Sequence, residues 1–156
     1  MTKYLIAFLI SMVPLIELRA GVPAAVAMGM NEFAAIAVCA LGNMLPVPFI
    51  YFFARKFLLW GMNKKYIGKI CTFFVEKGEK AGQKLTSKTG RGGLFVALLL
   101  FVGIPLPGTG AWTGTLAASF LNMGFKSAVV SVTLGVLLAG IIMATISAGA
   151  FSIIGL

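Results

Sequence analysis

Two stretches of the chain are apolar over a length that can cross a lipid bilayer. Residues 33–54 form an uncharged stretch of 22 residues, and a second long apolar stretch covers residues 127–153. A membrane-spanning helix needs about 20 consecutive apolar residues. Each stretch therefore predicts one transmembrane helix.

Four other apolar runs are too short to cross a bilayer as helices. Runs of about 10–14 residues are more typical of re-entrant segments, which enter and leave the membrane on the same side. The four runs form two pairs, 4–16 with 24–30 and 94–104 with 111–121. This pattern predicts two re-entrant helical hairpins.

The two members of each pair are separated by a break rich in proline and glycine. Residues 17–23 separate the first pair, and residues 104–114 separate the second. Proline does not fit a helix interior, and glycine permits unusual backbone angles. Irregular backbone at membrane depth survives only where protein or a water-filled cavity surrounds it. We therefore expect the tips of the two hairpins to meet.

The two halves of the chain repeat the same order of elements. A shift of 91 residues superposes Pro14 on Pro105 and Asn31 on Asn122. The predicted fold is an all-α integral membrane protein of two inverted repeats, each a re-entrant helical hairpin plus one transmembrane helix. Transporters recurrently use this plan. The alternative is four plain spanning helices, which the charge of Lys3 favours and that of Lys126 does not.

The composition agrees with a membrane protein. The chain has 156 residues, of which 60% are hydrophobic and 11% are charged. Soluble domains are about one quarter charged. The length predicts a single membrane domain, 1–156, made of a first repeat (1–54), a linker (55–92) and a second repeat (93–156).

The positive charge is concentrated in the linker. The chain has a net charge of +9, and ten of its 13 Lys and Arg residues lie between residues 55 and 91. Strongly basic chains can bind nucleic acid. Here, however, the basic run joins two membrane segments, which is typical of a cytoplasmic loop. We expect a cytoplasmic linker and no nucleic-acid partner.

The linker also has the pattern of an amphipathic helix. Its apolar and its basic side chains each recur at helical spacing: Tyr66, Ile70, Phe73 and Phe74, and Lys77, Lys80, Lys84 and Lys88. Such a helix would lie on the inner leaflet of the membrane. Its lysines would either recognise anionic lipid headgroups or remain solvated charges that fix the topology.

Several classes of chemistry are not expected. The chain has no histidine, and its two cysteines, Cys39 and Cys71, do not have the spacing of a metal site. No nucleophile lies next to a convincing base in the sequence. We therefore expect no metal, no cofactor and no enzymatic activity.

Glu17 and Arg19 are the main candidates for function, because they interrupt an apolar region. A charge at the centre of a bilayer costs at least about 2.5–3.5 kcal/mol, and such residues usually face a cavity. Arg19 could bind an anionic group such as phosphate through its planar fork of donors. Glu17 could take up and release protons. The alternative is a structural salt bridge that holds the hairpins together.

The second break supplies uncharged candidates. They are Pro105, Pro107, Gly108, Thr109, Gly110, Trp112 and Thr113. A half-helix that starts at such a break directs the positive end of its dipole at a bound anion. The alternative is that these small residues allow helices to pack closely. Asn43, in the first long apolar stretch, would either bond to another helix or contact substrate.

Three blocks of the sequence resemble the small multidrug export protein family, which is similar to the DedA superfamily of bacterial membrane proteins. The blocks are "SMVPLIELRAGVP", "LGNMLPVPFIYFF" and "GIPLPGTGAWTGTLAA". The resemblance implies a transporter-like fold with two facing re-entrant hairpins. For DedA relatives it implies the handling of lipid headgroups, including polyprenyl phosphates, by charged hairpin residues. Here residues 103–114 contain no arginine, unlike DedA proteins proper.

The resemblance and the residues together lead to one main hypothesis and two rivals. The main one is a homodimeric transporter of the bacterial inner membrane. It would move an amphipathic or anionic lipid-like substrate, with proton coupling through Glu17. The first rival is an exporter of cationic drugs that uses Glu17 as counter-ion and aromatic rings such as Phe101 and Trp112 for stacking. The second rival is a membrane scaffold or assembly factor that transports nothing.

Overall fold

The computed structural model describes residues 1–14, 16–106 and 108–154, and all regular structure in this part of the chain is helical. The predicted all-α class is therefore confirmed. The helices are α1 (Thr2–Met12), α2 (Glu17–Ala27), α3 (Glu32–Met44), α4 (Val47–Met62), α5 (Gly68–Gly103), α6 (Ala111–Phe120) and α7 (Phe125–Ile154). Pro107, one of the candidate site residues, lies outside the described residues.

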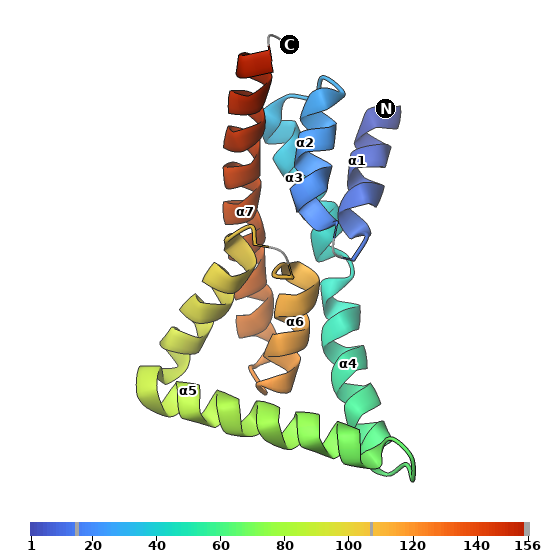
Figure 1. Cartoon of the computed structure of the whole chain (residues 1–156), viewed down its shortest axis with the longest axis vertical. Coiled ribbons are helices and arrows are strands. Elements are labelled where there is room, and N and C mark those ends of the chain that lie inside the picture. The colour runs from blue at the N-terminus through green and yellow to red at the C-terminus, as the bar shows by residue number, and fades with distance from the viewer. Residues whose placement is uncertain (15, 107, 155–156) are drawn as a thin grey trace.

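The helices α1 and α2 form the first antiparallel pair (Figure 1). The break between them lies N-terminal to the one that the sequence predicted, because Pro14 ends α1. Proline lacks the N–H that would bond to the carbonyl of Ile10, and the N–H of Val13 takes that carbonyl instead, at 3.2 Å. The prediction that residues 17–23 form the break was therefore wrong. These residues form the first turns of α2, and Pro23 lies inside that helix.

The second antiparallel pair is made by the last part of α5 and by α6 (Figure 1). The helix α5 bends at Gly90, whose φ of 69° is left-handed. Residues before this bend lie across one end of the molecule, and residues after it turn back along the bundle. The irregular segment between α5 and α6 ends at Gly110, within the break that the sequence predicted.

Within the described part of the chain, two helical segments are long and apolar enough to cross a membrane. They are Glu32–Met62, which comprises α3 and α4, and Phe125–Ala150 within α7. The first continues beyond residue 54, where the sequence predicted its end. A break at Leu45 and Pro46 separates α3 from α4, because Pro46 and Pro48 lack the N–H groups that would bond to the carbonyls of residues 42 and 44.

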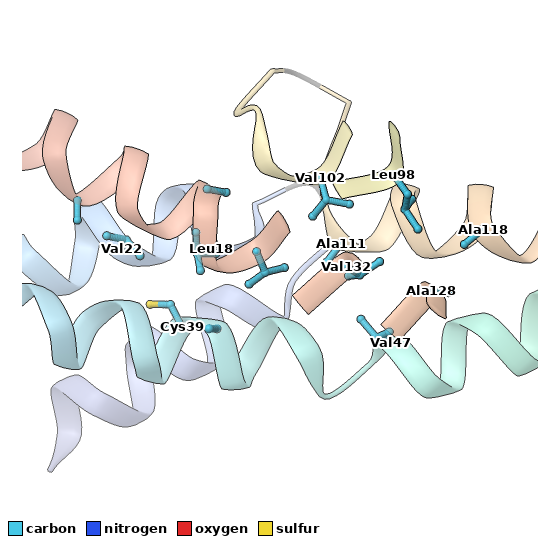
Figure 2. Packing of buried hydrophobic residues seen from close by; sticks show 14 of the residues in the cluster. Leu18, Val22, Cys39, Val47, Leu98, Val102, Ala111, Ala118, Ala128 and Val132 are labelled. Carbon is cyan, nitrogen blue, oxygen red and sulfur yellow. The ribbon is translucent and has the colours of Figure 1, made fainter. Parts of the chain in front are cut away.

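The two helix pairs open toward opposite ends of the molecule, and their turns meet near its middle (Figure 1). Figure 2 shows the packing at this level, where Leu18 of α2, Val102 of α5 and Ala111 of α6 belong to one buried cluster. Each of these side chains is at most 1% exposed. The start of α2, the end of α5 and the start of α6 therefore share one buried core.

Candidate functional site

Glu17 binds the N-terminus of α6. It is the first residue of α2, it is only 4% exposed, and its φ of 52° is left-handed. The N–H of Ala111 donates to its Oε2 at 3.1 Å, and the N–H of Trp112 donates to its Oε1 at 3.0 Å. The first N–H groups of a helix have no partner within that helix, and a negative charge there is favourable. Glu17 therefore caps a helix of the other half of the chain.

Arg19 binds the segment that follows α5. Its Nη1 donates to the carbonyl of Leu106, and its Nη2 donates to the carbonyl of Ile104 at 3.3 Å and to Oγ1 of Thr109. Carbonyls at the C-terminal end of a helix carry the negative end of its dipole, which favours a cation. Arg19 and Glu17 thus bind the two helix ends that flank one break. We call Glu17, Arg19 and the described residues 104–106 and 108–112 the tip junction.

The tip junction explains how a charged pair is accommodated inside an apolar protein. The Glu17 carboxylate accepts hydrogen bonds from N–H groups, and the Arg19 guanidinium donates hydrogen bonds to oxygen atoms. Such charge-assisted bonds are stronger than neutral ones. On a regular helix, residues two apart point in nearly opposite directions. Glu17 is at the start of α2 with left-handed backbone angles. Its side chain and that of Arg19 reach the same segment.

Gly110 is required for this geometry. Its φ of 136° and ψ of −172° lie in a region that is essentially restricted to glycine. A Cβ at this position would lie 2.7 Å from Cδ of Glu17 and closer still to Oε2. The absence of a side chain therefore lets the carboxylate reach the N–H groups of α6.

The structure brings most of the sequence-predicted site residues to the tip junction, although some make only local bonds. Thr109 donates its hydroxyl to Ile104 and Leu106 at 3.0 and 2.9 Å while Arg19 donates to it. Oγ1 of Thr113 donates at 3.4 Å to the carbonyl of Gly110, the residue just before its own helix. Pro105 is half-buried and Gly108 is exposed.

Two buried polar atoms have no hydrogen-bond partner among the described residues. One is Nε1 of Trp112, and the other is Oδ1 of Asn43 on α3, whose residue is 2% exposed. Asn43 lies close in sequence to the break between α3 and α4. The Oδ1 of Asn43 therefore makes no hydrogen bond to another helix among the described residues.

Replacing Asn43 by alanine is expected to leave the free energy of unfolding unchanged or slightly higher. The substitution removes a buried acceptor that has no partner, and such a group costs about 1–3 kcal/mol. This gain offsets the small cavity that is left behind. The measurement is a denaturant titration of the purified protein in detergent.

The matched control is Tyr51→Phe, because the Tyr51 hydroxyl does have a partner. It donates to the carbonyl of Met123. Its removal is expected to lower the free energy of unfolding by about 1–2 kcal/mol. If Asn43→Ala is the more damaging of the two, its amide has a partner that this structure does not show.

Sequence reasoning missed the backbone groups that complete the site. These are the N–H groups of Ala111 and Trp112 and the carbonyls of Ile104 and Leu106. Residue type does not identify backbone partners, and the only available signal was the pair of glycines around Thr109. Among the described residues, no group of three or more His, Cys, Asp or Glu side chains could hold a metal ion.

Comparison with known proteins gives one family. A family model described as "Putative small multi-drug export protein" matches residues 17–142, a range that includes Glu17, Arg19, Asn43 and the whole second break. No curated protein and no solved structure matches the chain significantly. Because the matched range covers well over half of its 156 residues, the chain belongs to this family of small multi-drug export proteins.

Proposed function

We propose that the protein exports an amphipathic compound with an anionic group through the tip junction. The pairs α1–α2 and α5–α6 act as re-entrant hairpins that enter the membrane from opposite sides, and α3–α4 and α7 cross it. The description of the family supports export. The opposite orientations of the two helix pairs agree with the inverted-repeat plan of transporters. The protein acts as a homodimer in the bacterial inner membrane, with residues 55–92 in the cytoplasm.

One observation carries this proposal: the Glu17 carboxylate accepts hydrogen bonds from the N–H groups of Ala111 and Trp112. A helix N-terminus attracts anions, and here a carboxylate of the protein takes that place. An anionic group of the substrate would compete with Glu17 for the same N–H groups.

Protonation of Glu17 provides the coupling in this mechanism. A neutral carboxyl group is a weaker acceptor than a carboxylate, so a proton on Glu17 weakens its bonds to α6. The N–H groups of Ala111 and Trp112 then become free for the substrate anion, and Arg19 supplies a nearby positive charge. The substrate and the proton are then released together on the other side, which restores the bonds of Glu17. Proton and substrate therefore move in the same direction, and a pH gradient that is acid on the loading side drives transport.

Transport by purified protein in liposomes tests this mechanism. A fluorescent alkyl phosphate serves as the anionic probe and ethidium as the cationic probe, each with and without a pH gradient. Glu17→Gln is expected to lower transport of the alkyl phosphate driven by the gradient about tenfold or more, since a charge-assisted bond contributes about 1.5–3 kcal/mol. Arg19→Gln is expected to impair the alkyl phosphate more than ethidium.

Two substitutions provide controls with the same change of charge. Glu32 is exposed in the first turn of α3, and Arg91 is exposed just after the bend in α5. Glu32→Gln and Arg91→Gln are therefore expected to transport at nearly the rate of the unmodified protein. A cation exporter would give a different result. It would not move the alkyl phosphate, and it would still transport ethidium as Arg19→Gln but not as Glu17→Gln. Absence of transport for both probes would favour the rival hypothesis of a membrane scaffold that transports nothing.

A further inference from the structure

The corner where α4 ends and α5 begins lies at one end of the molecule, away from the turns of the two helix pairs (Figure 1). A basic pocket lies at this corner. It is open and has a volume of about 490 Å³. Its lining includes Lys64, Lys65 and Lys69, together with Thr72 and one acidic residue, Glu76. Among these charged groups the three positive charges outnumber the single negative one, so the pocket favours an anion.

The start of α5 adds to this preference. Gly68, the first residue of the helix, also lines the pocket. The N-terminus of a helix carries partial positive charge, which adds to the field of the lysines. The hydroxyl of Thr72, one turn further along, can donate a hydrogen bond to an anion.

A row of exposed aromatic rings on α4 leads to this pocket. The ring centroids of Phe53 and Phe57 are 6.2 Å apart, and those of Phe57 and Trp60 are 6.1 Å apart. All three side chains are exposed. The Nζ of Lys64 lies 4.5 Å from the centroid of the Trp60 ring. An apolar surface on a membrane-spanning segment thus ends at the first lysine of the pocket.

We propose that this pocket binds the phosphate headgroup of an anionic phospholipid, with an acyl chain against the rings of Phe53, Phe57 and Trp60. Tryptophan is enriched where a membrane meets water, and lysines just outside a span attract anionic lipids. A soluble phosphate compound could use the lysines but not the aromatic row. The site is separate from the tip junction and does not depend on the transport mechanism.

Binding of phosphatidylglycerol to the purified protein in detergent tests the proposal, with phosphatidylcholine as the neutral comparison. The test variant carries Lys64→Gln, Lys65→Gln and Lys69→Gln. The matched control carries Lys80→Gln, Lys84→Gln and Lys88→Gln, which remove the same charge from exposed positions further along α5. The dissociation constant is expected to rise about tenfold or more for the test variant and less than about threefold for the control.

Two further measurements keep the proposal falsifiable if the test variant folds poorly. Glu76→Gln removes the negative charge of the pocket and is expected to tighten phosphatidylglycerol binding about two- to fivefold. Glycerol 3-phosphate is expected not to displace the lipid, because it lacks the acyl chain. Any one of three results would overturn the proposal. The two triple variants could lose equal affinity for phosphatidylglycerol, Glu76→Gln could leave that affinity unchanged, or glycerol 3-phosphate could displace the lipid.

Discussion

Glu17→Ala is expected to lower the free energy of unfolding by about 2–4 kcal/mol. The substitution leaves the N–H groups of Ala111 and Trp112 without the acceptors that they have at 3.1 and 3.0 Å. A donor left unpaired in a buried site costs about 1–3 kcal/mol, and loss of a helix cap costs about 0.5–2 kcal/mol. The measurement is a denaturant titration in detergent, read by circular dichroism.

Two further substitutions at Glu17 separate its side chain from its backbone. Glu17→Gln keeps an oxygen that can accept one bond and is expected to lose about half as much stability as Glu17→Ala. Glu17→Gly removes the side chain but relaxes the left-handed φ of 52°. It is therefore expected to be more stable than Glu17→Ala by about 1 kcal/mol.

The control for these variants is Glu32→Ala, which removes an exposed carboxylate from the first turn of α3. Its effect on the free energy of unfolding is expected to stay below about 0.5 kcal/mol. If Glu17→Ala behaves like Glu32→Ala, the carboxylate does not cap α6 in the folded protein.

Gly110→Ala is expected to lower the free energy of unfolding by about 3 kcal/mol or more. An alanine at φ 136° and ψ −172° is strained by about 1–3 kcal/mol. Its Cβ would also collide with the Glu17 carboxylate, which would have to leave the N-terminus of α6. Both effects act together, so we expect little folded protein. The yield of monodisperse protein in detergent and its melting temperature are the measurements.

Gly108→Ala is the matched control. It introduces backbone strain at a positive φ, but its added Cβ does not collide with Glu17. Gly108 has a φ of 81°, but an added Cβ would meet no atom within 4 Å. The expected loss is about 1–2 kcal/mol. Combining Gly110→Ala with Glu17→Ala should give less than the sum of the two losses, since the same bonds are lost in both. A strictly additive pair would contradict the contact between Gly110 and Glu17.

The lengths of the apolar runs and the positions of the prolines predicted much of the fold, because both act locally. The short runs became α1, α2, the last part of α5 and α6, and the long ones became α3–α4 and α7. The errors occurred where two signals competed. The sequence placed the first break at residues 17–23 because charge, glycine and proline coincide there. In the structure, the helix already ends before Pro14, and Pro23 is accommodated within α2.

The candidate site was predicted in part. Glu17 and Arg19 could be identified because charges in an apolar region need a reason to be there. Their partners could not be identified, because these include N–H and carbonyl groups that every residue type provides. The role of Gly110 depends on a close approach between residues far apart in the sequence. Such an approach follows from the packed arrangement of the helices and not from local pattern.

The proline break at Leu45 and Pro46 has a mechanical consequence. Above it, α3 packs on α1 and α2; below it, α4 packs on α5 and α6 and is bonded to Met123 and Ser119 through Tyr51. Two backbone hydrogen bonds of the helix are missing there, because Pro46 and Pro48 cannot donate them. Their absence makes the helix easier to bend at that point. A pivot there would change the angle between α3 and α4 and would strain the bonds between Glu17 and the start of α6. The helix α7 packs on α2 and α3 as well as on α5 and α6, and it would oppose this motion.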